Sequence, residues 1–187
     1  SFRGNPMAEI AAEACAGLNA IREVTDIENT ASLHRHGERP ETLPDVAPGA
    51  AAQIQYTSGT TGFPKGAVLS HMGLVNNARF YASRCGVTEE TVWINVMPMF
   101  HTSGCGMVTL GCLQAGARMV LIGLFDPAVV VERMESEGVS MLLCVPTMLV
   151  ALLEAQEAAP RDLSGLGYVS CGGSRVAPEL VRRVRQT

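Results

Sequence analysis

Residues 139–147 read VSMLLCVPT, an apolar run closed by a proline–threonine pair. The run has the length of a strand and shows no polar alternation, which is typical of a parallel strand covered by helices on both faces. Pro146 predicts the start of a helix, because proline fits the first helical position, and we expect this helix to reach about Gln156. A strand, a short turn and a helix therefore form the expected unit.

The same alternation recurs on both sides of this unit. Strands are expected at residues 51–58, 91–98, 118–123 and 166–171, and helices open at Ser70, Asp126 and Pro178. Residues 107–116 (MVTLGCLQAG) predict a further buried helix that ends at Gly116. Strand and helix alternate at least four times with short connections, which predicts an α/β fold: a doubly wound, mainly parallel sheet with helices on both faces.

The N-terminal part follows a different pattern. Pro6 predicts a helix to about Ala16, and a short strand is expected near residues 20–27. The polar stretch that follows is rich in proline and glycine and has no period, which indicates a linker or surface crossover. We therefore expect two parts: residues 1–49 with the helix, short strand and linker, and residues 50–187 as the α/β core of a partial domain.

The composition excludes several classes of protein. The net charge of −4 and the scattered basic residues predict no nucleic-acid partner. No apolar stretch reaches the roughly 20 residues that a membrane span needs. Six single cysteines without a CxxC pair indicate reduced thiols in a cytoplasmic protein. His34 and His36 are spaced like metal ligands on a strand, but no carboxylate or thiol pattern joins them, so we expect no metal site in the chain.

Residues 56–66 read YTSGTTGFPKG and follow directly on an apolar-alternating run. Glycines let backbone N–H groups approach an anion closely, and hydroxyl groups and a lysine add donors and positive charge. The loop therefore has the chemistry of a phosphate site. It departs from the P-loop pattern, since Pro64 stands where glycine is needed and Gly66 follows Lys65. A hydrophilic turn without a ligand is the alternative.

The order of residues in this loop resembles the phosphate-binding signature [YF]-T-S-G-[ST]-T-G-x-P-K-G of the adenylate-forming superfamily. Residues 98–104 (PMFHTSG) resemble the second core motif of that superfamily, whose histidine lines the carboxylate site. Residues 170–178 (SCGGSRVAP) resemble the strand-end motif that lies against adenine. In this motif Ser174 and Arg175 stand where alanine and proline are usual. The resemblance covers essentially the whole chain.

This resemblance implies the roles of individual residues. Lys65 is expected to hold the leaving pyrophosphate and His101 to orient the acid, so both are candidate catalytic residues. Taken alone, His101 fits a packed loop histidine better. The implied nucleotide-binding residues are Thr57, Ser58, Gly59, Thr60, Thr61, Gly62, Gly172, Gly173, Ser174 and Arg175. An apolar groove walled by the helix after His101 and by residues 145–147 is expected to seat the acid.

The implied reaction has two steps. A carboxylate attacks the α-phosphorus of Mg-ATP to give an acyl-adenylate and pyrophosphate, and the thiol of coenzyme A then displaces AMP. ATP, Mg²⁺ and coenzyme A are thus the implied cofactors. The sequence around His101 is similar to that of the fatty-acyl and medium-chain ligase branch. Two alternatives stay open: an amino-acid- or aryl-acid-activating branch, and a truncated protein that only binds nucleotide or another subunit.

Several parts of the superfamily pattern are missing. The sequence has no Y-G-x-T-E motif, no ribose-binding aspartate and no small C-terminal domain with its catalytic lysine. The chain therefore resembles a fragment of the large N-terminal domain of an acyl-CoA ligase, and we expect it to be inactive alone. Only 17% of its residues are charged, against about 25% in typical domains. Exposed sheet edges and a surface with few charged residues predict a homo-oligomer.

Overall fold

The computed structural model describes residues 6–19, 21, 44–57 and 63–186. It divides the chain into two compact units, Ser1–Asp45 and Val46–Thr187; the predicted boundary after residue 49 stays a prediction. In the first unit, α1 (Met7–Cys15) confirms the predicted N-terminal helix. The expected short strand, apart from Ile21, and both His34 and His36 lie outside the described residues.

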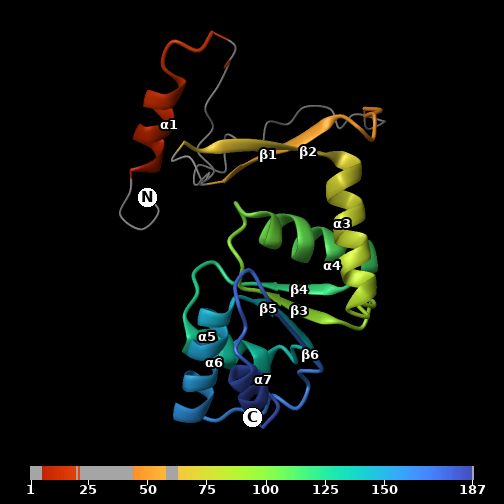
Figure 1. Cartoon of the computed structure of the whole chain (residues 1–187), viewed down its shortest axis with the longest axis vertical. Coiled ribbons are helices and arrows are strands. Elements are labelled where there is room, and N and C mark those ends of the chain that lie inside the picture. Colours follow the sequence, from red (N-terminus) through yellow and green to blue (C-terminus); the bar gives the residue numbers. More distant parts are fainter. Residues whose placement is uncertain (1–5, 20, 22–43, 58–62, 187) are drawn as a thin grey trace. The chain divides into compact units, whose positions relative to one another are not determined.

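A four-stranded parallel sheet forms the centre of the second unit, in the order β4-β3-β5-β6 (Figure 1). Its strands, which confirm the predicted ones, are β3 (Val92–Asn95), β4 (Arg118–Leu121), β5 (Met141–Cys144) and β6 (Tyr168–Cys171). Ile94 pairs with Val120 on one side and with Leu142 on the other, and Leu142 pairs in turn with Val169. This register aligns the carboxyl ends of all four strands at one edge.

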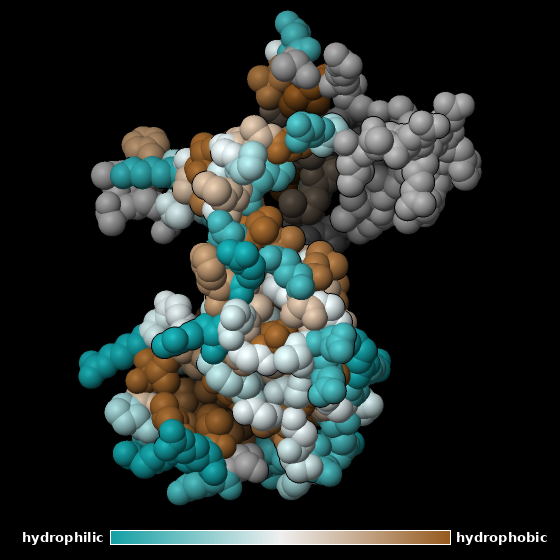
Figure 2. Space-filling view, turned by 90° about the vertical axis from the view of Figure 1, so that its right-hand side faces the viewer, coloured by the Kyte–Doolittle hydropathy of each residue, from teal (hydrophilic) through white to brown (hydrophobic). Residues whose placement is uncertain are grey.

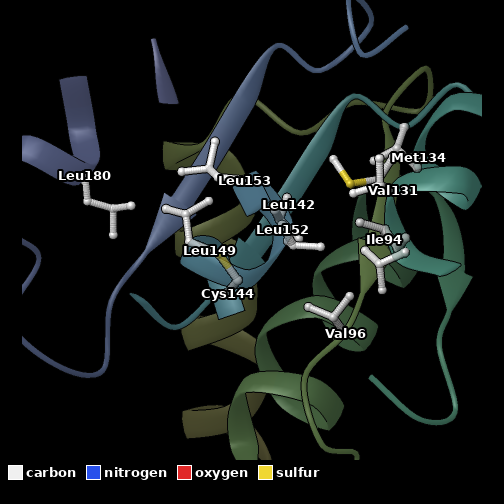
Figure 3. Packing of buried hydrophobic residues seen from close by; sticks show 12 residues of the cluster. Ile94, Val96, Val131, Met134, Leu142, Cys144, Leu149, Leu152, Leu153 and Leu180 are labelled. Atoms are coloured by element: carbon white, nitrogen blue, oxygen red, sulfur yellow. The ribbon is translucent and has the colours of Figure 1, made fainter. Parts of the chain in front are cut away.

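One face of this sheet carries the larger hydrophobic cluster (Figure 3). Ile94, Leu142 and Cys144 point to it and expose 1% of their surface or less. They pack with three helices: α5 (Pro127–Ser136), α6 (Pro146–Ala158) and α7 (Pro178–Val184). Each of these helices begins at the proline that predicts it, because a proline at the first position gives up no helical hydrogen bond.

The opposite face is covered by α3 (His71–Arg84), the π-helix η1 (Ser103–Leu110) and α4 (Gly111–Ala115). Trp93, Met141 and Leu143 alternate with the residues of the first cluster and pack on this side. The Ser70 side chain caps α3 as predicted, accepting a hydrogen bond from a backbone amide at 3.1 Å. With helices on both faces, the predicted doubly wound arrangement is confirmed.

The first predicted strand is not part of the parallel sheet. β1 (Ala51–Thr57) pairs antiparallel with β2 (Lys65–Ser70) to make a separate two-stranded sheet (Figure 1). We expected only a short apolar piece after the glycine-rich loop, and not the strand β2. An antiparallel partner needs no helical crossover, so a short loop is enough to return the chain along β1.

Candidate functional site

The carboxyl ends of β3, β5 and β6 open into a cavity of about 620 Å³. The chain leaves β3 toward β4 on one side and returns to β5 on the other, so the connections diverge here. Open α/β sheets bind their ligands at such a switch point. The lining is mainly apolar, with methionines from η1 and α6 facing the strand ends. The cavity is therefore the candidate site.

His101 lies on the loop between β3 and η1 and lines this cavity. Its Nδ1 atom accepts a hydrogen bond from the Ser103 backbone N–H at 3.1 Å and lies 2.8 Å from Ser103 Oγ. Because an amide N–H can only donate, Nδ1 is the acceptor in this contact, and a ring proton lies on Nε2. The structure thus places the predicted histidine at the cavity as a donor with a defined tautomer.

A buried amide side chain fixes the loop that carries His101. Asn95, which is fully buried, donates from Nδ2 to the Gly104 carbonyl oxygen at 3.2 Å and accepts the Met97 N–H at 3.1 Å through Oδ1. A Cβ atom on Gly104 would lie 2.4 Å from the Pro98 carbonyl oxygen, so η1 approaches the exit of β3 as closely as glycine allows. Sequence reasoning missed this clamp, although an asparagine inside an apolar strand is its visible signal.

The hydroxyl groups of Tyr81 and Ser170 form a second polar element of the cavity that the sequence did not predict. Tyr81 donates its O–H to Ser170 Oγ at 2.6 Å, and its ring stacks on Trp93 with the centroids 6.0 Å apart. Burial raises the pKa of Tyr81 to about 12, since the phenolate would lose its hydration. At neutral pH the phenol therefore stays protonated and acts as a donor.

The predicted adenine motif is only partly at the cavity. Gly172 and Gly173 follow β6 and line it, and Gly173 has a φ of 82°, a conformation that favours glycine. Ser174 and Arg175 are exposed and do not line the cavity. A nucleotide contact for any of these four residues stays a prediction.

The predicted phosphate loop joins the two strands of the β1–β2 hairpin. Thr57 and Lys65 are cross-strand partners and are both exposed, and neither lines the cavity. Ser58, Gly59, Thr60, Thr61 and Gly62 lie outside the described residues. Gln53 of β1 contacts the thiol of Cys105 in η1 at 3.6 Å, which links the hairpin to the helix behind His101.

Two neighbouring thiols lie at the ends of β5 and β6. Cys144 and Cys171 are register partners, and burial, together with the adjacent thiol, raises the pKa of Cys144 to about 12. Both cysteines are free. A thiol with so high a pKa is a poor nucleophile at neutral pH. These cysteines therefore act as packing residues of the strand ends.

Two further findings concern the described ranges as a whole. Within them, no three histidine, cysteine or carboxylate side chains gather in a way that could hold a metal ion. No helix in this part of the chain combines the length and the apolar character needed to cross a bilayer. The polar side chains that line the cavity carry hydroxyl groups, one thiol and one imidazole.

A family profile and individual known proteins match this sequence. The sequence profile of the family described as AMP-binding enzyme matches residues 6–187. A feruloyl-CoA synthase of Amycolatopsis sp. is 34% identical over 78% of this chain and 30% of its own length. The medium-chain fatty-acid–CoA ligase of Escherichia coli is 30% identical over 72% of this chain and 24% of its own length. The chain therefore spans less than a third of either relative.

Solved structures match the fold as well. The crystal structure of ATP-bound MatB from Rhodopseudomonas palustris superposes with a TM-score of 0.68 at 28% sequence identity, over 75% of this chain and 27% of that protein. The described α/β core thus corresponds to a part of a larger protein in this comparison.

Proposed function

The chain belongs to the AMP-binding enzyme family, and on this premise we propose that it forms the acid-binding part of an ATP-dependent acid–CoA ligase. In the proposed reaction a carboxylate attacks the α-phosphorus of ATP, releasing pyrophosphate, and the thiol of coenzyme A then displaces AMP from the acyl-adenylate. The observation that carries the proposal is the apolar cavity at the switch point with His101 on its wall. Single free cysteines support a cytoplasmic location.

The proposed task of His101 is to orient the carboxylate. Its Nδ1 atom is already engaged by Ser103, so Nε2–H is the donor available to a carboxylate oxygen. A donor held in place by the loop positions the attacking oxygen without reorganisation, which is the main protein contribution to phosphoryl chemistry. The Asn95 clamp supports this role, because it fixes both ends of the loop segment around His101.

Lys65 and residues 57–62 are the proposed grip on the leaving pyrophosphate. The ammonium group offsets developing negative charge, and the hydroxyl and amide donors of the loop supply directed hydrogen bonds. Gly172 and Gly173 are proposed to lie against the adenine, since they occupy the neighbouring strand end. We assign no step to Mg²⁺, because the described residues offer no cluster of metal ligands; the ion would enter with ATP.

The apolar lining of the cavity narrows the range of possible substrates. Its described lining contains no Asp or Glu that could pair with an α-ammonium group, which argues against an amino acid. Met107, Leu143 and Met148 instead offer an apolar wall. We therefore propose an apolar carboxylic acid, either fatty or aromatic. The curated relatives include a medium-chain fatty-acid ligase and a feruloyl-CoA synthase.

ATP–pyrophosphate exchange by the complete protein that contains this sequence tests the proposal. We expect exchange that depends on an apolar carboxylic acid, and His101→Ala should lower kcat/KM by about 10- to 100-fold through lost orientation. His71→Ala is the matched control, because His71 is exposed at the start of α3 and does not line the cavity. Unchanged exchange in His101→Ala would dismiss the proposed role.

The 187-residue chain alone is proposed to be inactive, since it spans less than a third of its relatives. Formation of an acyl thioester by this chain in the presence of ATP and coenzyme A would contradict that statement.

A further inference from the structure

The Tyr81–Ser170 pair lies deep in the cavity. Ser170 is opposite Leu143 in the register of β6 and β5, two residues before Gly172. At about 3.3 Å per residue, it is roughly 7 Å further along the strand than the glycine at the open edge. His101 lies on the loop that follows β3, at that edge. An acid held at His101 would therefore extend its apolar body toward the two hydroxyl groups.

The hydrogen bonds of this pair leave one donor unused. Tyr81 donates to Ser170 Oγ, and within the described part of the chain no hydrogen bond is formed by the hydroxyl hydrogen of Ser170. Burial raises the pKa of Tyr81, so at neutral pH the phenol keeps the proton that it donates in this bond. A hydroxyl that accepts one hydrogen bond becomes a stronger donor in the next. Ser170 thus presents a polarised O–H to the cavity.

The surroundings of this donor are apolar. Leu143, Met107 and Met148 line the same cavity, and their side chains offer no strong acceptor to Ser170. A hydrocarbon group placed against the hydroxyl would remove it from water without replacing the lost hydrogen bond. An oxygen atom on the ligand would satisfy it. Sites with such a donor discriminate strongly against analogues that lack the partner atom.

We propose that Tyr81 and Ser170 select carboxylic acids whose apolar body carries a hydrogen-bond-accepting oxygen at its far end, such as an ether, a ketone or a phenol. The inference rests on the proposed function, in that the cavity must bind the acid. Tyr81 acts as a positioning residue in this arrangement, and Ser170 makes the contact with the ligand oxygen.

The test compares acids that differ in one atom. 4-Methoxycinnamate carries an ether oxygen where 4-ethylcinnamate has a methylene group. In the same way, 7-methoxyheptanoate carries an ether oxygen where nonanoate has a methylene group. Pyrophosphate exchange by the complete protein is measured with each acid. We expect kcat/KM to favour the oxygen-bearing member of at least one pair by about tenfold or more, the effect of one lost hydrogen bond to a buried donor.

Substitutions then assign the preference to the pair. Ser170→Ala should bring the ratio close to one, mainly by raising KM for the oxygen-bearing acid. Tyr81→Phe keeps the ring on Trp93 but removes the hydroxyl, and it should reduce the ratio as well. Ser83→Ala on the exposed side of α3 and Tyr168→Phe on β6 are the matched controls, since neither residue lines the cavity.

The outcomes separate the two proposals. A ratio near one for both acid pairs in the unmodified protein overturns the selectivity inference, as does a ratio that survives both Ser170→Ala and Tyr81→Phe in folded protein. If Ser170→Ala does not fold, judged by circular dichroism, the result for Tyr81→Phe decides. If none of the four acids supports exchange while ATP binding is intact, the proposed function itself fails.

Discussion

Among the described glycines, Gly104 leaves the least room for a side chain. An added Cβ atom would lie 2.4 Å from the Pro98 carbonyl oxygen and 2.8 Å from that of Met97, and backbone atoms cannot move aside as a side chain can. We predict that Gly104→Ala lowers the free energy of unfolding by about 1–3 kcal/mol, the usual cost of overpacking. Urea unfolding of the 187-residue chain measures this change.

A glycine without neighbours provides the control for this substitution. Gly123 follows β4, and a Cβ atom there would meet no heavy atom within 4 Å. Gly123→Ala should therefore leave the free energy of unfolding within about 0.5 kcal/mol of its original value. Equal effects of the two substitutions would show that the close approach at Gly104 does not affect the free energy of unfolding.

Tyr81 should make stability depend on alkaline pH. Its pKa is raised from 10.0 to about 12, so the folded chain holds this proton more tightly than the unfolded chain. The resulting stabilisation is complete below pH 10 and is lost as the pH rises from 10 to 12. We predict that Tyr81→Phe flattens the fall in unfolding free energy across this window, measured by urea unfolding at several pH values. An unchanged slope would contradict the burial of the phenol.

At the scale of elements, α5 depends on its N-cap residue, Asp126. Asp126 Oδ1 accepts hydrogen bonds from the backbone amides of Ala128 and Val129 at 3.0 and 3.2 Å, and α5 contributes Val130, Val131 and Met134 to the larger cluster. Asp126→Ala should cost about 0.5–2 kcal/mol of unfolding free energy. Glu132→Ala on the exposed side of the same helix is the control and should cost far less. A loss no larger than that of the control would refute the capping role.

Elements were predictable where their ends carry chemical signals. Prolines marked α5, α6 and α7, Ser70 marked α3, and unbroken apolar runs marked the parallel strands. The strand β2 was expected only as a short apolar piece, because most of its residues are exposed and their burial does not alternate as in a half-buried strand. The π-helix η1 was expected as an α-helix that began four residues later, since an eight-residue stretch is too short for its period to differ visibly.

The residues of the candidate site were likewise predictable only where a local sequence signal marks them. His101, Gly172 and Gly173 were found because each belongs to a local motif, and the structure brings all three to one cavity. The contact between Tyr81 and Ser170 was missed because the two residues are 89 positions apart and meet only through the packing of α3 on the sheet. A contact of this range leaves no mark in the local pattern of either segment.

For the whole molecule, the two edges of the parallel sheet, which have no partner strand among the described residues, and the apolar surface predict self-association. β4 and β6 are the edge strands, and Leu121 and Tyr168 on them are 53% and 42% exposed. Figure 2 shows apolar side chains at the bottom of a hollow in the lower part of the molecule, bordered by polar ones. We predict that analytical ultracentrifugation of the 187-residue chain detects a dimer or larger species.

A charge on either edge strand should weaken this association. Leu121→Lys and Tyr168→Lys are expected to shift the equilibrium toward monomer, because lysine on an edge opposes strand pairing. Val75→Lys, at an exposed position of α3, serves as the control. A monomer at all concentrations of the original chain would rule the oligomer out.

The clamp formed by Asn95 and Gly104 has a consequence for how the chain can diversify. It leaves no room for a side chain at position 104, because an added Cβ atom there collides with the backbone of Met97 and Pro98. The cavity lining also contains flexible methionine side chains from η1 and α6, Met107 and Met148, which tolerate replacement. Evolutionary or laboratory tuning of ligand choice is therefore expected to proceed through these methionines, while position 104 has to stay glycine.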